Sequence, residues 1–391
     1  MEPALQSIIE AATSGPQRGA AYNKTAEFCD RWGWRLSGST NLAESTADLE
    51  PMLQRWDGME VRYEPANIPR WEREGLGWAE ECSLVEPRIG SPSQPALEKV
   101  RQQKLDILGL GKSEGTPAEG ITAEAIVVTS WQDLWEKRDS VEGKIVVYAV
   151  DWEGYSLTTR YRSRGASMAA RFGARAALIR SAASFSIASP HTGKMVILFS
   201  ISCAVILANP KGITIAGGGG YMHDNGKEEG YTITADSSMG KQCPFFVNLT
   251  LPADMPRIPH AGLATEDSDM LRRMAARDER IVIKLVMGGK NFPFDPRGRN
   301  TIAEIRGSEK PDEIVLISGH IDSWDVGQGA MDDAGPAFIA QQALNIVKQL
   351  GLQPKRTLRW VGWTTEEQGN RPGTGAQSFP GTAGGGAYFR L

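Results

Sequence analysis

The sequence has few cysteines and few histidines, four of each in 391 residues. The cysteines form no Cys-x-x-Cys pair, so neither a structural zinc ribbon nor a disulfide framework is indicated. Basic and acidic residues nearly balance, 43 against 47, and no basic cluster is interleaved with aromatic residues. Nucleic acid is therefore not an expected partner.

Two kinds of apolar segment are missing as well. Residues 1–17 lack the basic start and the continuous apolar core of a secretory signal peptide, so these residues alone predict a cytoplasmic chain. The main apolar run, residues 195–208, is too short to cross a bilayer comfortably and has no second run beside it. We therefore expect no membrane span. Glycosylation patterns at Asn23 and Asn248 would matter only in a secreted protein.

Alternating helical and strand-like patterns predict an α/β fold, and the length allows two domains. The N-terminal part has helical spacing at 1–14 and 41–56, strand-like alternation at 59–68, and loop composition at 69–73 and 87–95. We expect a domain junction in the last of these stretches, because proline and serine gather there.

A compact αβ module follows the junction. The patterns predict strands at 123–130, 143–150 and 176–179, and helices at 131–140 and 164–172. The module contains no cluster of titratable side chains. We therefore interpret it as a lid or partner-docking domain without chemistry of its own.

Two histidines and one long segment of this middle part are harder to place. His191 has no carboxylate at ligand spacing and is expected to be structural or exposed, and His260 is not expected to bind metal. Residues 194–255 combine the apolar run with a glycine cluster and show no periodicity. A buried strand, an ill-ordered insertion and a membrane anchor all remain open, and translated non-coding sequence is our favoured hypothesis.

A second α/β stretch begins near residue 301. Its patterns predict strands at 301–308, 314–318 and 357–364, a loop at 310–312 and a helix at 336–350. After residue 256 and before this stretch, a helix around 266–276 and a strand around 280–287 complete the middle part.

The strand at 314–318 leads into Gly-His-Ile-Asp, which places an imidazole and a carboxylate at its exit. Because residues two apart on a strand face the same way, His320 and Asp322 should project together, as a metal ligand and its hydrogen-bonding orienter. A lone His-x-Asp at a strand end is more often ordinary polar surface. Asp332, in the glycine-rich loop that follows, favours the metal site and is the candidate bridge between two ions.

Two adjacent acids, Glu366 and Glu367, follow the strand at 357–364. Adjacent acids alone carry little information, and at Glu80-Glu81 we expect solvated side chains. At a strand end opposite a bridging aspartate, however, one glutamate can bind metal while the other moves a proton from water to the leaving amine. This pattern predicts metal-assisted hydrolysis of a peptide bond.

Five sequence runs together resemble one known family. They are RLSGSTNL at 35–42, EGITAEAIVVTS at 119–130, LIRSAASFSIASPHTG at 178–193, SGHIDSWDVGQGAMDD at 318–333 and GLQPKRTLRWVGWTTEEQG at 351–369. In these runs the chain resembles the co-catalytic zinc peptidases, which include bacterial aminopeptidases and glutamate carboxypeptidase II. The resemblance covers nearly all of residues 20–193 and 256–369.

The resemblance implies an α/β fold of the aminopeptidase-like, phosphorylase/hydrolase type. A mixed-sheet, three-layer peptidase domain would be interrupted by an inserted protease-associated α/β domain. Its parts would be an N-terminal peptidase part at 1–85, the protease-associated (lid) domain at 86–295 with the atypical insertion 194–255, a metal-binding part at 296–370 and an aberrant glycine-rich tail at 371–391.

The resemblance also implies two zinc ions. His320 corresponds to a ligand of one ion, Glu367 to a ligand of the other, and Asp332 to the bridging carboxylate, which a cis peptide bond would join to Asp333. A single carboxylate shared by two closely spaced ions is the usual arrangement in such hydrolytic sites.

By the same resemblance Glu366 is the general base, and Asp322 supports the catalytic centre. The implied activity is that of a metallo-exopeptidase, a carboxypeptidase or dipeptidase that cleaves dipeptides and short peptides with free termini. The family implies a secreted or lysosomal glycoprotein that forms a homodimer.

The pattern of the family continues beyond residue 369 with an aspartate ligand, the last histidine ligand and further strands. Residues 370–391 contain no Asp, Glu or His. We therefore expect a C-terminally truncated domain, doubtful zinc occupancy, and an uncovered edge on the strand at 357–364. The alternative function is that of a catalytically inactive isoform or gene-model product, which would act at most as a binding or dimerisation module.

Overall fold

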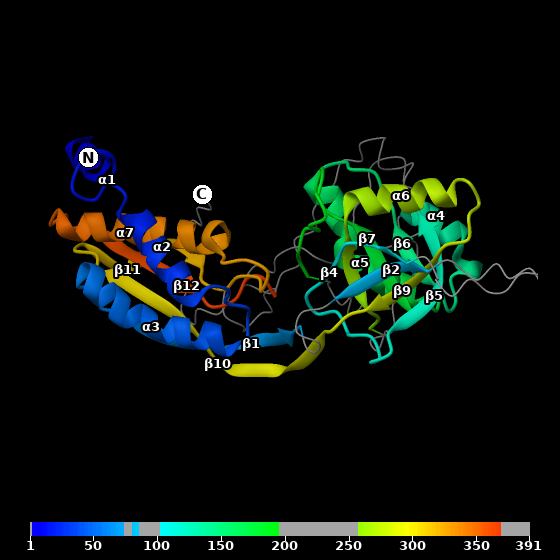
Figure 1. The fold of residues 1–391 in the computed structure, drawn as a ribbon. Helices are drawn as coiled ribbons and strands as arrows, with labels where there is room; N and C mark the ends of the chain where they lie inside the picture. The colour runs from blue at the N-terminus through cyan, green and yellow to red at the C-terminus, as the bar shows by residue number, and fades with distance from the viewer. Residues whose placement is uncertain (1, 74–79, 86–101, 195–256, 369–391) are drawn as a thin grey trace, which may run out of the picture. The chain divides into compact units, whose positions relative to one another are not determined.

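A computed structural model describes residues 2–73, 80–85, 102–194 and 257–368 (Figure 1). The chain divides into two compact units, residues 1–72 with 291–391 and residues 73–290. The expected junction at 87–95, nearly all of 194–255 and the tail at 371–391 lie outside the described residues. The assignment of the middle part as a protease-associated domain stays a prediction.

The first unit combines helices and a sheet, and both of its parts contribute to each. Its helices are α1 (Glu2–Thr13), α2 (Ala20–Trp32), α3 (Thr40–Asp57), a short π-helical turn η3 (Ala330–Ala334) and α7 (Gly335–Gln349). Its strands are β1 (Arg62–Glu72), β10 (Lys290–Ile305), β11 (Lys310–His320) and β12 (Arg356–Trp363).

The sheet of this unit has the strand order β1-β10-β12-β11, and it is mixed because β12 runs antiparallel to β10 and parallel to β11. This is the mixed α/β fold that the sequence predicts. The expectation that residues 357–364 would form an uncovered edge is wrong, since β12 is paired on both sides. Among the described strands the edges belong to β1 and β11.

Two expected loops are strands. Residues 69–72 continue β1, which pairs with β10 and so remains extended through Pro69. Residues 310–312 open β11, where the register against β12 shifts between Lys310 and Ile314. Such an irregularity accommodates Pro311, which has no amide hydrogen to give to a regular ladder.

The core of the first unit lies where α2, α3 and α7 meet the sheet. The ring of Phe28 on α2 packs edge-on against Phe338 on α7, with 5.2 Å between the ring centres. The buried indole of Trp360 on β12 donates a hydrogen bond of 2.9 Å to the Ala337 carbonyl. This packing fixes α7, and with it the turn that carries Asp332, against the strand that leads to Glu366 and Glu367.

The second unit is built around a sheet of eight strands in the order β3-β2-β9-β5-β6-β7-β8-β4. Its strands are β2 (Glu81–Val85), β3 (Gln102–Lys104), β4 (Ile107–Gly109), β5 (Ile121–Val128), β6 (Ile145–Tyr148), β7 (Ala176–Arg180), β8 (His260–Leu263) and β9 (Val282–Val286). Its helical segments are α4 (Trp131–Glu136), the 3-10 turn η2 (Arg138–Ser140), α5 (Tyr155–Ala170) and α6 (Thr265–Ala275).

Two expectations for this unit need correction. Helix α5 begins at Tyr155, well before the predicted start at residue 164. The prediction missed its first turns because they are largely polar. Glu80 is not solvated: its carboxylate forms a buried ion pair of 2.6 Å with Arg73 and accepts the Gly109 amide at 2.6 Å. Its neighbour Glu81 is exposed.

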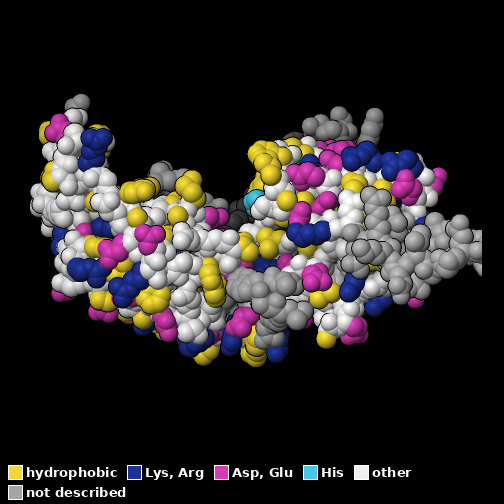
Figure 2. Space-filling model, in the orientation of Figure 1, with side chains coloured by type: hydrophobic (Ala, Val, Ile, Leu, Met, Phe, Trp, Pro, Cys, Tyr) yellow, Lys and Arg dark blue, Asp and Glu magenta, His cyan; other side chains and the backbone are white. Residues whose placement is uncertain are grey.

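The charged residues of the surface are mixed in sign, as the balanced composition predicts. Lys, Arg, Asp and Glu side chains are interspersed over the face of each unit seen in Figure 2. Cys29 and Cys82 are buried free thiols, and the other two cysteines lie outside the described residues. Within the described part of the chain, no helix combines the length and the apolar character needed to cross a membrane.

Candidate metal centre

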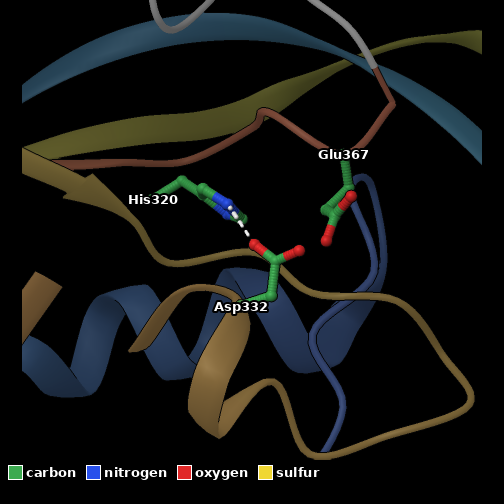
Figure 3. Close-up of side chains that lie close together, drawn as sticks. All are labelled: His320, Asp332 and Glu367. Atoms are coloured by element: carbon green, nitrogen blue, oxygen red, sulfur yellow. Dashed lines mark hydrogen bonds and ion pairs between the residues drawn. The ribbon is translucent and has the colours of Figure 1, made fainter. Parts of the chain in front are cut away.

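Three side chains from separate segments of the first unit converge at one end of its sheet (Figure 3). His320 is the last residue of β11, Asp332 lies in the turn before α7, and Glu367 follows β12. One potential ligand atom of each residue lies within 4.8 Å of those of the other two. Strands β11 and β12 are parallel, so their carboxyl ends meet at the same edge and bring the first and third residues together.

The His320 ring is held at both nitrogens. Its Nδ1 lies 2.9 Å from the backbone carbonyl of Asp322 and 3.2 Å from the Oδ1 of that residue. Its Nε2 lies 3.0 Å from Oδ1 of Asp332. With Nδ1–H donating to the carbonyl, Nε2 is the nitrogen left to bind a metal, and without a metal a proton on Nε2 makes the hydrogen bond to Asp332.

Asp322 contacts His320 from the loop after β11, whereas the sequence predicted that both residues lie on one strand. Strand β11 ends at His320, so Asp322 belongs to the loop that follows and not to the same strand. Its carboxylate is fully buried and accepts the Glu366 amide at 2.9 Å, the Glu367 amide at 3.1 Å and the Ser37 hydroxyl at 2.9 Å. Asp322 therefore links the ends of β11 and β12.

Asp332 is presented by a turn that departs from helical geometry. Gly329, at φ 61°, leads into η3, and the Asp332–Asp333 peptide bond is cis. The resemblance implied this cis bond. The Asp333 carboxylate accepts the His320 amide at 2.9 Å, which ties the turn to the end of β11. In Figure 3 the Asp332 carboxylate lies between the His320 ring and the Glu367 carboxylate.

The two adjacent glutamates differ in their surroundings. Glu367 is buried, and its Oε1 has no hydrogen-bond partner among the described residues. Glu366 is half-buried, and its backbone amide donates to the Asp322 carboxylate. The pair thus combines a buried glutamate with a half-buried one.

The concentration of carboxylates changes the acid–base properties of the site. Burial lowers the pKa of His320, but hydrogen bonds to Asp322 and Asp332 outweigh it and raise the pKa to about 11. Burial, together with the charges of Asp322 and Asp332, raises the pKa of Glu367 to about 8. Both side chains therefore lie where neighbouring carboxylates favour a proton or another cation.

A metal ion fits this arrangement on three counts. Imidazole nitrogen and carboxylate oxygen are the ligands that zinc takes in hydrolytic sites. Glu367 holds a buried acceptor atom without a donor, which is costly unless a cation satisfies it. The His320 ring is also oriented through its second nitrogen, as metal-binding imidazoles usually are.

Sequence reasoning missed one polar residue of the site. The Ser37 hydroxyl contacts both the Asp322 carboxylate and, at 2.6 Å, the Thr365 hydroxyl. It lies in the run RLSGSTNL, which carries part of the resemblance. No local pattern could reveal its role, because its partners are far away in the sequence.

Comparison with known proteins gives matches to the part of the chain that holds the candidate metal centre and to nearly the whole chain. Residues 300–389 match the model of peptidase family M28. The chain is 42% identical over 375 residues to carboxypeptidase Q of Homo sapiens and 41% identical over 374 residues to that of Xenopus laevis. Each match covers 96% of this chain. The chain spans 63% and 64% of the length of these two relatives.

Solved structures agree with this result. An M28 peptidase precursor from Shewanella amazonensis matches with a TM-score of 0.67 at 27% identity, over 94% of this chain and 67% of the other. A zinc aminopeptidase from Bacillus subtilis matches with a TM-score of 0.51 at 16% identity, over 89% of this chain and 61% of the other, and so bears on the fold alone.

Proposed function

Because this chain belongs to the carboxypeptidase Q-like M28 peptidases, we propose that it acts as a zinc metallopeptidase on dipeptides and short peptides with free termini. The observation that carries the proposal is the convergence of His320, Asp332 and Glu367 within 4.8 Å. A further acid, Glu366, precedes Glu367 in the chain, and its amide is held by Asp322.

In this proposal His320, Asp332 and Glu367 would hold two zinc ions. Asp332 would serve as the shared carboxylate, since its side chain lies between the other two (Figure 3). The bound metal would supply Lewis-acid chemistry: it lowers the pKa of a coordinated water toward neutrality and polarises a carbonyl oxygen.

The remaining steps belong to side chains of this chain. The Glu366 carboxylate takes a proton from the attacking water and delivers it to the amine nitrogen as the C–N bond breaks. Asp322 keeps Glu366 and Glu367 in place through their backbone amides and orients His320 through its Nδ1. Its three accepted hydrogen bonds are satisfied within the protein, so it can hold this geometry without solvent.

Assembly and location are further parts of the proposal. By relation to carboxypeptidase Q we propose a secreted or lysosomal glycoprotein that forms a homodimer. Asn23, the first residue of one glycosylation pattern, is exposed on α2, and Asn248 lies outside the described residues. Light scattering of the purified chain and enzymatic deglycosylation of the secreted form test these points.

The decisive experiment measures zinc content and dipeptide hydrolysis on the full 391-residue chain. Glu366→Gln should retain zinc and lower kcat by about 10² to 10⁴, the usual contribution of a general base. Asp332→Asn should lose both zinc and activity, since it removes the shared charge. Glu309→Gln, at an exposed glutamate paired with Lys355 elsewhere in this unit, is the matched control.

The outcomes separate an enzyme from a binding module. Hydrolysis that survives Glu366→Gln would contradict the role of that residue. A wild-type chain that is folded and binds zinc but cleaves no dipeptide would contradict the peptidase proposal and favour the non-enzymatic alternative.

A further inference from the structure

Arg35 is a fully buried arginine whose guanidinium donates to backbone carbonyls near the candidate metal centre and to one in its own segment, and which also interacts with the Cys29 thiol. Its Nε donates to the Ile321 carbonyl at 2.7 Å. One terminal nitrogen donates to the Gln328 carbonyl at 2.8 Å and the other to the Gly329 carbonyl at 3.2 Å. The first of these terminal nitrogens also contacts the Gly33 carbonyl.

These acceptors mark the two ends of a single loop. Ile321 directly follows His320, and Gly329 directly precedes the η3 turn that carries Asp332. One planar side chain therefore fixes the start and the end of the segment that separates two of the three converging residues. Its three carbonyl contacts set how far apart those ends lie.

The guanidinium is itself held rigidly. The Arg35 amide donates to the Ser323 hydroxyl at 2.9 Å, and the Ser323 amide donates to the Arg35 carbonyl at 3.0 Å. On its other side the guanidinium carbon lies 4.9 Å from the centre of the Phe28 ring. Such support is what keeps a positioning group in a fixed geometry.

The loop in turn is shaped to admit the guanidinium. A Cβ atom on Gly329 would come within 2.7 Å of an Arg35 terminal nitrogen and would also collide with Ser323. The φ of 61° at this residue is a second reason for glycine. The close approach of loop and side chain thus depends on residues from two distant parts of the sequence.

We propose that Arg35 is a positioning residue of the metal centre, which sets the spacing of His320 and Asp332 by holding both ends of the loop 321–329. A lysine could not replace it, because an ammonium group lacks the fork that reaches carbonyls on both sides. For zinc as the metal, this inference rests on the proposed function. The loop-ordering part of it does not.

The test compares Arg35→Met with Leu49→Ala in the full-length chain. Leu49 is fully buried on α3 in the hydrophobic core of the same unit, so it controls for general loss of stability. The measurements are the affinity for Co²⁺, the visible absorption spectrum of the Co²⁺-loaded chain, and hydrogen exchange of residues 321–334 without metal.

Arg35→Met should weaken Co²⁺ binding by about 10- to 100-fold, as removal of outer-shell support commonly does. It should also change the Co²⁺ spectrum and speed exchange in the loop, whereas Leu49→Ala should change neither. Arg35→Lys should fall between wild type and Arg35→Met, and it decides the question if Arg35→Met does not fold.

Equal Co²⁺ affinity and equal loop exchange in wild type and the Arg35 variants would overturn the inference, as would equal losses in Leu49→Ala. If no chain binds Co²⁺, exchange of the metal-free loop alone decides. A wild type that binds Co²⁺ without cleaving peptides, together with the expected loss in Arg35→Met, would contradict the proposed function and leave this inference standing.

Discussion

Each unit of the chain contains a buried histidine, and the two rings have opposite acid–base properties. His320 of the first unit is 8% exposed and lies among carboxylates, which raise its pKa to about 11. His260 of the second unit is fully buried on β8, and burial together with the charge of Arg162 lowers its pKa to about 3. The one ring favours positive charge, while the other excludes it.

The difference shows what suits a buried histidine to binding a metal. Neither ring nitrogen of His260 has a hydrogen-bond partner among the described residues, and no group of metal-binding side chains in that part of the chain includes it. His320 is oriented at Nδ1 and faces Asp332 at Nε2. Burial is common to both, so the oriented carboxylates distinguish the site.

Replacement of each histidine by leucine gives the largest expected contrast. His320→Leu removes a ligand and should weaken zinc binding by more than about 100-fold, beyond the loss typical of outer-shell changes. His260→Leu should leave zinc affinity unchanged. Isothermal titration of both variants measures the contrast, with circular dichroism to show that each is folded.

Comparable losses of zinc affinity in the two variants would break the comparison. They would mean that stability of the whole chain, and not the ligand, governs metal binding. A normal affinity in His320→Leu would remove the residue from the proposed ligand set.

Acid should destabilise the second unit through His260. The unfolded chain binds a proton at this residue near pH 6.5 and the native chain only near pH 3, so the unfolded state holds more protons between these values. Stability from neutral His260 is complete above pH 6.5 and is lost as pH falls. The loss between pH 6.5 and pH 4 should be about 3 kcal/mol.

Urea unfolding of wild type and His260→Leu at several pH values isolates this contribution, because carboxylates titrate equally in both proteins. The leucine variant should lose less stability on acidification, with the difference growing below pH 6.5. Parallel pH dependence in the two proteins would show that His260 is protonated in the folded state. Hydrogen exchange in β7 and β8 assigns the effect to this unit.

Local sequence features predicted much of the candidate site, because the proposed ligands follow strands with recognisable apolar runs. His320 and Glu367 lie at the ends of β11 and β12. The proximity of Asp332 depends on a glycine-rich turn, which composition also indicated.

Long-range packing could not be predicted in the same way. The expectation of an uncovered edge on β12 is wrong. Strand order depends on which segments pair in space, and the sequence does not show this directly. It treated Glu80 as solvated, although its buried partner Arg73 lies seven residues away. Arg35 and Ser37 act on residues far away in the sequence, and single-sequence patterns carry no signal for such pairs.

The smallest effect within this comparison is expected from Ser37→Ala. The substitution removes the hydroxyl that contacts Asp322 at 2.9 Å and Thr365 at 2.6 Å, and leaves one buried carboxylate oxygen with a single backbone donor. A lost hydrogen bond to a charged group costs about 1.5 to 3 kcal/mol, so stability should fall by that amount. Zinc affinity should fall less than in Arg35→Met, since the Glu366 and Glu367 amides still hold Asp322.

Ser45→Ala is the matched control, because Ser45 is equally buried but bonds only within α3. Equal effects of the two substitutions on zinc affinity would show that Ser37 contributes packing alone, and that Asp322 keeps its orientation without it.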